Sequence, residues 1–406
     1  MPRLLMVTQY YLPEMGAPQT RLSEWGEELI SLGWAVEVLT ALPNYPTGSI
    51  FEGYNPKKPV KEQIGRIDVV RCPLHPASEG FLNRLYCYFS FVRSCKRYGP
   101  ALCRKPDVMF VESPPLFIGY AVRALKKHWH VPFVFNVSDL WPESVVRMQI
   151  IKEGFLSKMA EHLERSIYRE AVAVTGQSDE IVNSIQRKCP EIRTCLISNG
   201  VDPSRFGPEK ATDESRAFLR RRSNQTVFLY AGLFGLAQGL DQILDVASRV
   251  REDQAIQFVL IGDGPVRAHL EDRVRGESLT NVRLLPPQNR EKIPTLLASA
   301  DVAMVTLGVH IPGAVPSKIY EAMASAIPIL LVADGEPARR VEEAGAGIAV
   351  GYNDIEALEN AVYRLHRDKD LRLKMGRAGR HAATTRYNRK DIAAKLDMLL
   401  RDVIER

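Results

Sequence analysis

Short apolar segments alternate with amphipathic helical segments from one end of this chain to the other. Parallel strands need a helical crossover between them, so this alternation predicts an α/β fold built on parallel sheets. A clear helix is expected from Pro18, which suits a first helical turn, to Gly33, which suits the position after a helix. Twelve strands are predicted, at Leu4–Thr8, Ala35–Thr40, Asp68–Arg71, Val108–Val111, Phe133–Val137, Val172–Thr175, Val227–Ala231, Gln257–Ile261, Val282–Leu285, Val302–Val305, Ile329–Val332 and Ile348–Val350.

The length of 406 residues predicts two domains, each with its own hydrophobic core. Turn-forming residues between Ser198 and Thr226 mark the boundary. We therefore expect Rossmann-like domains at 1–200 and 201–385, facing each other across a cleft, with a C-terminal helix at 386–406 packing back on the first domain. Ligands should bind at the carboxyl ends of the strands.

The formal charge of +6 is mild, and its distribution matters more than its size. The window Phe81–Lys105 holds six basic residues and no acid, interleaved with aromatic and apolar side chains. This pattern is typical of a segment on an anionic membrane surface, but a core helix with solvated basic residues fits equally well. Nucleic acid is a poorer partner, since the remaining charge is balanced and no nucleic-acid motif occurs.

Other classes of protein are disfavoured by what the chain lacks. Its six cysteines show no metal-ligand spacing and predict reduced thiols in a cytoplasmic protein. The eight histidines form no metal motif, so no metal cofactor is expected. The apolar run at the N-terminus is too short for a signal peptide, and no run approaches the ~20 residues that span a bilayer.

The segment from Pro316 to Ala324 is the most informative for function, because it reads as a loop followed by a helix. Ser317 is the expected N-cap, which places Lys318 in the first turn, where the backbone dipole disfavours a cation. A lysine there is explained if an anion binds at the helix start. Glu321 follows on the same face and could bind sugar hydroxyls. The alternative is a capped helix with a surface Lys–Glu pair.

Three glycine-containing loops follow strands and are candidate phosphate or sugar cradles. Gly16 precedes the first helix and could admit a diphosphate, or could only make the turn. Gly232 and Gly235 lie in a glycine-rich loop of the second half, and Gly262 starts another turn there. The first of these loops lacks the GxGxxG pattern, which disfavours a dinucleotide-binding fold of the standard kind.

Asp139 follows the strand Phe133–Val137 and precedes Leu140 and Trp141. An acid at the carboxyl end of a strand could orient or deprotonate an acceptor hydroxyl. The alternative is an aspartate that only caps a helix or a turn.

These segments together resemble the GT-B glycosyltransferases of family 4, in particular the branch that builds O-antigen, capsule and exopolysaccharide repeats. The resemblance covers nearly the whole chain. It rests on the following segments: Tyr10 to Glu14 with Gly16, Asp139 to Ser144, Asn199 to Asp202, Gly262 to Pro265, and Val315 to Ala324.

The resemblance implies a GT-B fold and a retaining transfer of sugar from a nucleotide diphosphate, for which UDP is the preferred carrier. It implies that Lys318 binds the donor diphosphate, Glu321 the ribose, and the region of Leu285 the base. The donor site implied in this way comprises Gly16, Gly232, Gly235, Gly262, Leu285, Gly313, Ala314, Val315, Ser317, Lys318 and Glu321.

The chain also departs from the family's pattern. Many relatives have cations where this chain has Leu233 and Gln238, so Lys318 would carry more of the phosphate charge. Gly313 stands where many have an acid that contacts the sugar, so backbone amides at Gly313 to Val315 are expected to replace it. Ser138 stands where many have a histidine.

The predicted function is a retaining glycosyltransferase of cell-surface polysaccharide synthesis that needs no metal. The expected catalytic residues are Lys318 and Asp139. The expected acceptor is a saccharide, lipid-linked at the inner face of the plasma membrane, reached through the window 81–105. The alternatives are a nucleotide-sugar epimerase or hydrolase on the same frame, and a non-catalytic partner subunit.

Overall fold

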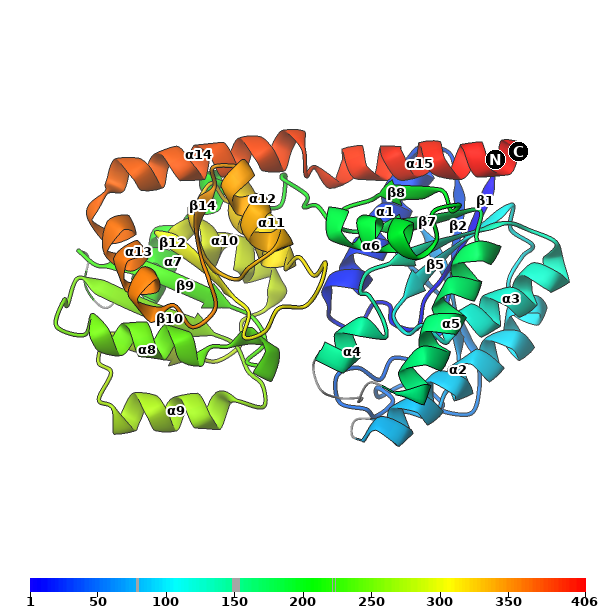
Figure 1. The fold of residues 1–406 in the computed structure, drawn as a ribbon, viewed down its shortest axis with the longest axis horizontal. Coiled ribbons are helices and arrows are strands. Elements are labelled where there is room, and N and C mark those ends of the chain that lie inside the picture. The colour runs from blue at the N-terminus through cyan, green and yellow to red at the C-terminus, as the bar shows by residue number, and fades with distance from the viewer. Residues whose placement is uncertain (78–79, 148–153, 221, 223) are drawn as a thin grey trace. The chain divides into compact units, whose positions relative to one another are not determined.

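A computed structural model describes residues 1–77, 80–147, 154–220, 222 and 224–406. The chain divides into two compact units, each built around its own parallel sheet (Figure 1). Unit 1 comprises Met1–Asn199, Pro312–Ala314 and Arg389–Arg406, and unit 2 comprises Gly200–Ile311 and Val315–Asn388.

Unit 1 is built on an eight-stranded sheet in the order β3-β4-β2-β1-β5-β6-β7-β8. The central strands are continuous apolar runs, as expected of parallel strands covered on both faces. Their bounds are β1 Arg3–Val7, β2 Ala35–Ala41, β3 Val60–Ile64, β4 Ile67–Cys72, β5 Val108–Ser113, β6 Phe133–Val137, β7 Ala173–Gly176 and β8 Thr194–Leu196.

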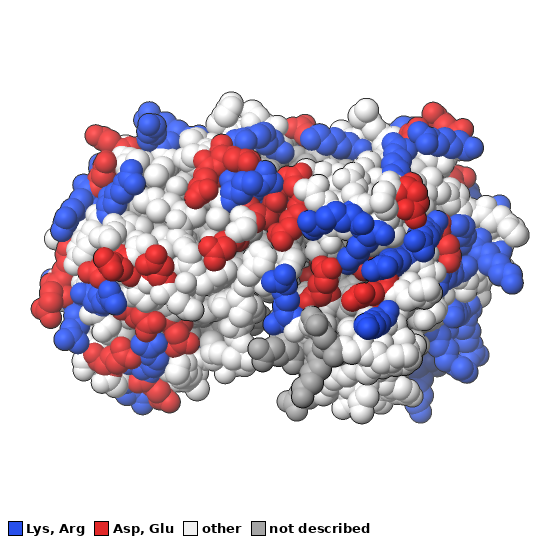
Figure 2. Space-filling model, viewed as in Figure 1, with Lys and Arg blue, Asp and Glu red and all other residues white. Residues whose placement is uncertain are grey.

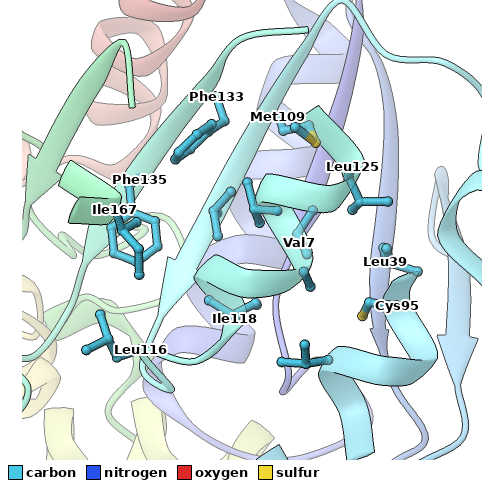
Figure 3. Packing of buried hydrophobic residues seen from close by; sticks show 14 of the residues in the cluster. Val7, Leu39, Cys95, Met109, Leu116, Ile118, Leu125, Phe133, Phe135 and Ile167 are labelled. Atoms are coloured by element: carbon cyan, nitrogen blue, oxygen red, sulfur yellow. The ribbon is translucent and has the colours of Figure 1, made fainter. Parts of the chain in front are cut away.

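Successive side chains of β1 enter opposite cores, because side chains alternate across a strand. Leu5 and Val7 join one core together with residues of α2 and α3, as Figure 3 shows for Val7, Ile118 and Leu125. Leu4 and Met6 join the other, which α1 and α15 cover. The helices of unit 1 are α1 Ala17–Ser31, α2 Phe81–Leu102, α3 Ile118–Trp129, α4 Glu143–Arg147, α5 Phe155–Glu170, α6 Asp179–Lys188 and α15 Arg389–Glu405.

Unit 2 contains a six-stranded parallel sheet in the order β11-β10-β9-β12-β13-β14. Its strands are β9 Thr226–Ala231, β10 Ile256–Ile261, β11 Val282–Leu285, β12 Val302–Thr306, β13 Ile329–Val332 and β14 Gly347–Val350. One face packs on α10, α11, α12 and α14, and the other on α8, α9 and α13.

The helical segments of unit 2 include three short 3₁₀ turns. They are η1 Pro208–Lys210, α7 Asp213–Leu219, η2 Leu236–Gln238, α8 Asp241–Arg249, α9 Arg267–Gly276, η3 Arg290–Lys292, α10 Ile293–Ser299, α11 Ser317–Ala324, α12 Glu336–Glu343, α13 Ile355–Arg367 and α14 Lys369–Thr385.

All twelve predicted strands are confirmed, with ends that lie within two residues of the predicted ones. Two further strands were missed, and one of them departs from the expected parallel pairing: β3 runs antiparallel to β4 through a tight turn at Gly65, where φ is +59°. β8 has only three residues and lies at the opposite edge. Gly33 follows α1 with a φ of +93°, as its predicted position after a helix requires.

The predicted N-cap of α11 is wrong by one residue. Ser317 is the first residue of the helix, Pro316 occupies the N-cap, and no side chain caps the helix. Lys318 is therefore the second helical residue and still lies in the first turn, so the dipole argument holds.

Candidate active site

Lys318 lies in a slot formed by α11 and the carboxyl end of β9 in unit 2. Its ammonium is 5.2 Å from the centre of the Tyr230 ring. A Cβ added at Gly232 would lie 2.4 Å from Cε and 2.6 Å from Nζ of this lysine, so only glycine leaves room for it. Burial lowers the pKa of Lys318, and the negative charge of Glu321 acts in the opposite direction.

No hydrogen bond or ion pair engages the Lys318 ammonium within the described part of the chain. A half-buried cation in the first turn of a helix is unfavourable without an anion, because burial and the helix dipole both oppose it. Such a group in a pocket is a candidate for ligand binding. Lys318 and Glu321 together line a small pocket with Leu229, Ala231 and neighbouring apolar residues.

Three strand ends meet beside this slot. The N–H of Gly232 donates to the carbonyl of Ile261 at 2.9 Å, and the N–H of Gly262 donates to the carbonyl of Leu285 at 3.2 Å. A Cβ at Gly262 would come within 1.8 Å of the Gly232 carbonyl oxygen. The structure thus brings Gly232, Gly262 and half-buried Leu285 to one sheet edge with Lys318.

Gly235 is the N-cap residue of the turn η2, in the loop that lacks the usual cations. Its φ of −104° suits any residue, but a Cβ there would lie 2.4 Å from Oε1 of Gln238. Leu233 and Leu236 are exposed, 50% and 83% respectively. The loop therefore offers backbone groups and apolar side chains to a ligand, and no cation.

Residues 313–315 divide between the units. Gly313 and Ala314 group with unit 1, whereas Val315 is buried in the core of unit 2. Gly313 has a φ of +73°, which favours glycine, and its N–H donates to the carboxylate of Glu180 at 2.8 Å. In this structure the Gly313 amide is thus occupied, and it is not free for the sugar contact expected of it.

Asp139 follows β6 in unit 1, at the carboxyl edge of that sheet. The helix α4 begins only at Glu143, so Asp139 does not cap it. Its Oδ1 is buried and has no hydrogen-bond partner within the described residues. Burial raises the pKa of Asp139, and the nearby Ser144 hydroxyl and Leu140 N–H partly oppose this.

A buried polar network that sequence reasoning missed lies directly before Asp139. The guanidinium of Arg21 contacts Glu112 at 2.5 Å and the hydroxyl of Ser138 at 2.8 Å, and it also bonds Asn199. Arg21 and Glu112 are 1% and 2% exposed. One signal was present in the sequence: Arg21 precedes the apolar residues Leu22 and Trp25 on the buried face of α1.

Gly16 occupies the N-cap of α1 in unit 1, with an extended φ of 174°. A Cβ there would lie 2.3 Å from Oε1 of Gln19, so the close approach of that side chain explains the glycine. The preceding loop is held by Glu14, whose carboxylate accepts N–H bonds from Tyr11, Asn44 and Tyr45 at 2.8 to 3.0 Å.

The basic window contains the whole of α2, of which one side is buried and the other is exposed. Cys87, Phe91 and Cys95 are buried in the core. Leu82, Tyr86 and Phe89 are exposed, at spacings that place them on one side of a helix. All six basic residues of the window are exposed, and Figure 2 shows lysine and arginine side chains gathered at the edge where α2 and α3 lie.

Two family descriptions match the chain. "Glycosyl transferase 4-like domain" matches residues 16–200, and "Glycosyl transferases group 1" matches residues 211–382. The chain is a glycosyltransferase.

Relatives of this glycosyltransferase agree in fold and class. It is 28% identical to the putative colanic acid biosynthesis glycosyl transferase WcaI of Escherichia coli K12, over 79% of this chain and 81% of the relative. The structure of sucrose-phosphate synthase from Thermosynechococcus elongatus covers 100% of both chains with a TM-score of 0.78 and 19% identity. HepE from Anabaena, solved with UDP and glucose, covers 99% of this chain and 100% of that chain, with a TM-score of 0.74 and 16% identity.

These likenesses confirm the predicted GT-B fold of two parallel-sheet α/β domains and the predicted class of enzyme. All six cysteines of the glycosyltransferase are free thiols. Among the described residues, no helix is long and apolar enough to cross a bilayer, and no three metal-ligating side chains gather in a group.

Proposed function

We propose that this glycosyltransferase transfers a sugar from a UDP-sugar to a saccharide acceptor with retained configuration, in the synthesis of a cell-surface polysaccharide. The observation that carries the donor half of the proposal is the ammonium of Lys318 in the first turn of α11, which has no hydrogen bond or ion pair among the described residues. UDP as the carrier is supported by HepE, which was solved with UDP and glucose. The polysaccharide role is supported by the colanic acid relative.

In the proposed mechanism the acceptor hydroxyl attacks the anomeric carbon on the face from which the diphosphate leaves. The leaving diphosphate takes up the acceptor proton, so no pair of carboxylates of the retaining-glycosidase kind is needed. Lys318 and the N-terminus of α11 stabilise the negative charge that develops on the leaving group. The proposal calls for no metal, because the lysine supplies the positive charge.

Asp139 is proposed to orient the acceptor hydroxyl. Its Oδ1 has no hydrogen-bond partner in the part of the chain that the structure describes, so it can accept a hydrogen bond from that hydroxyl. Because burial raises its pKa, the carboxylate form that accepts this bond is lost at a higher pH than for an ordinary aspartate. In a profile of kcat/KM against pH, the fall on the acid side should therefore occur at a higher pH than is usual for an aspartate. Asp139→Asn should abolish this fall.

The test of the donor site is a thermal-shift screen against UDP, GDP, ADP and a panel of UDP-sugars, with EDTA present. A ligand of the native state stabilises it by ~2.7 kcal/mol at a hundredfold excess over Kd. A shift with UDP that is lost in Lys318→Ala supports the proposal, and a shift with GDP alone would correct the base. The absence of any shift would contradict the donor site and favour a non-catalytic partner subunit, a reading that the missing cations at 233 and 238 also suggest.

The stereochemistry and the acceptor need a turnover assay. With the nucleotide sugar that gives the shift, the product anomer is read by NMR, and the proposal predicts the anomeric configuration of the donor. Release of free sugar without acceptor, or epimerisation of the donor, would instead indicate the hydrolase or epimerase alternative.

For the acceptor we propose a lipid-linked saccharide, reached from the inner face of the plasma membrane through α2. The support is the exposed side of this helix, where Leu82, Tyr86 and Phe89 lie among basic residues. Aromatic and leucine side chains can enter the interfacial region while the cations contact anionic head groups.

Vesicle flotation at low salt tests this surface. We expect binding to anionic vesicles that exceeds binding to neutral ones and weakens as salt rises. The double variant Arg93→Glu/Lys96→Glu should reduce binding to anionic vesicles and leave UDP binding unchanged. Equal binding of the wild type to neutral and anionic vesicles would contradict the electrostatic part of the proposal.

A further inference from the structure

Tyr230 is the aromatic residue that faces the ammonium of Lys318. It is the fifth residue of β9 and is 1% exposed. Its hydroxyl donates to the carbonyl of Leu233 at 2.7 Å, which fixes the ring against the loop that begins at Gly232. The ring centre is 5.2 Å from Nζ of Lys318, within the range of a cation–π interaction.

This partner differs from the one that a half-buried lysine usually has. A carboxylate would hold the ammonium but would also cancel its charge and compete with an incoming anion. The face of an aromatic ring attracts the cation through its quadrupole and carries no net charge. The full positive charge and the N–H donors of Lys318 thus stay available to an anionic ligand.

The arrangement matters more here because the neighbouring loop has Leu233 and Gln238 and no cation. Lys318 must then bind the diphosphate without help from a cation of that loop. If its ammonium lost its charge or its orientation, no side chain of the loop could replace it. A long side chain left without a partner would also have to be ordered when the ligand binds, and this ordering costs free energy.

We propose that Tyr230 is a positioning residue whose ring holds the Lys318 ammonium, charged and directed, at the site of the donor diphosphate. This rests on the proposed function, since it assigns the Lys318 slot to a diphosphate. Gly232 also bounds the slot, because a Cβ there would overlap Cε and Nζ of Lys318 in this position.

Three variants separate the ring from the rest of Tyr230. Tyr230→Phe keeps the ring and removes only the bond to Leu233. Tyr230→Leu removes the ring. Phe228→Leu is the matched control, because Phe228 is fully buried in the same core cluster, two residues earlier on the same strand.

The first readout is the affinity for UDP compared with that for uridine, by titration calorimetry. The ring contact should act on the diphosphate alone. We expect Tyr230→Leu to weaken UDP about 2- to 30-fold, the equivalent of a cation–π interaction, with uridine unchanged. Tyr230→Phe and Phe228→Leu should stay within about twofold of the wild type. An equal loss for UDP and uridine in Tyr230→Leu, or a loss no greater than in Phe228→Leu, would overturn the inference.

The second readout needs no ligand and therefore separates this inference from the proposed function. Competitive acetylation of the native protein over a range of pH, read by mass spectrometry, gives the pKa of Lys318. Glu321 is the charged group that acts on this lysine, and it is kept in every variant. Removal of the ring destabilises the ammonium, so the pKa should fall further in Tyr230→Leu than in Tyr230→Phe or Phe228→Leu. An unchanged or higher value in Tyr230→Leu would overturn the inference, even if no nucleotide binds.

Discussion

The backbone of Gly232 lies directly against the ammonium of Lys318, so that a methyl group added at residue 232 would come 2.6 Å from Nζ. Residues from β9 and α11, far apart in the sequence, thus form one site. The lysine fits in this position because the residue that follows β9 is a glycine.

Gly232→Ala should fold but bind the donor poorly. The added Cβ meets the far end of a flexible side chain, so Lys318 can move away, and the φ of +155° adds strain. The hydrogen bond from the Lys318 ammonium to the diphosphate would then be lost. A charged hydrogen bond contributes about 1.5–3 kcal/mol, so the affinity for UDP should fall about 10- to 100-fold. Calorimetric titration measures this, and an affinity equal to that of the wild type would show that Lys318 does not contact the nucleotide.

Gly262→Ala should act on folding, in contrast to Gly232→Ala. Its Cβ would lie 1.8 Å from a backbone oxygen that cannot move without disturbing β9. We expect the free energy of unfolding to fall by at least about 1–3 kcal/mol, the usual cost of overpacking. Gly276→Ala is the matched control, because nothing lies within 4 Å of that Cβ and alanine is favoured in a helix. Urea unfolding of both variants measures their free energies of unfolding. Similar values for the two would contradict the close packing of the ends of β9 and β10.

Lys318→Met should stabilise the ligand-free protein by about 0.5–2 kcal/mol at pH 7, because it removes a half-buried charge that has no ion-pair partner among the described residues. The pKa of Lys318 is lower in the folded than in the unfolded chain, so the unfolded chain binds more protons between that pKa and 10.5. The free energy of unfolding of the wild type should rise with pH in this window, and the variant should lack that rise.

Urea unfolding of the wild type and Lys318→Met at several pH values measures both effects. The exposed lysine of α14, Lys374, supplies the control, since Lys374→Met should leave the stability nearly unchanged. A loss of stability in Lys318→Met would contradict this prediction and indicate that the Tyr230 ring stabilises the ammonium more than its burial destabilises it.

The network beneath Asp139 should be among the most sensitive parts of unit 1. Arg21→Met leaves the carboxylate of Glu112 buried without its cation, and breaking a buried pair in this way typically costs about 3–5 kcal/mol. Arg66→Met breaks the exposed pair with Glu27 and should cost no more than about 1 kcal/mol. Equal losses in the two variants would show that the buried network does not hold the sheet edge.

The central strands could be predicted from the sequence because they are apolar runs buried on both faces, such as Val108 to Val111. β3 could not, since Val60–Ile64 alternates half-buried and exposed residues and its ladder is formed only with β4. β8 is too short to leave a pattern.

Part of the site was also predictable. Lys318 stands out in the sequence because a cation in the first turn of a helix is unfavourable. This unfavourable placement can be recognised from the segment around Lys318 alone. Tyr230 gives no such signal, and the position of Arg21 on the apolar face of α1 is a weaker one. Each looks like an ordinary member of its strand or helix, and its role depends on which distant segments the fold brings to it.

The central claim is that Lys318 binds the diphosphate of a UDP-sugar, and the most direct test is calorimetric titration of UDP into the wild type and Lys318→Ala, with EDTA present. We predict saturable binding to the wild type and a loss of at least about tenfold in Lys318→Ala, with the fold intact. Equal affinity of the two proteins for UDP would contradict the account and leave the Lys318–Glu321 pair with a structural role alone.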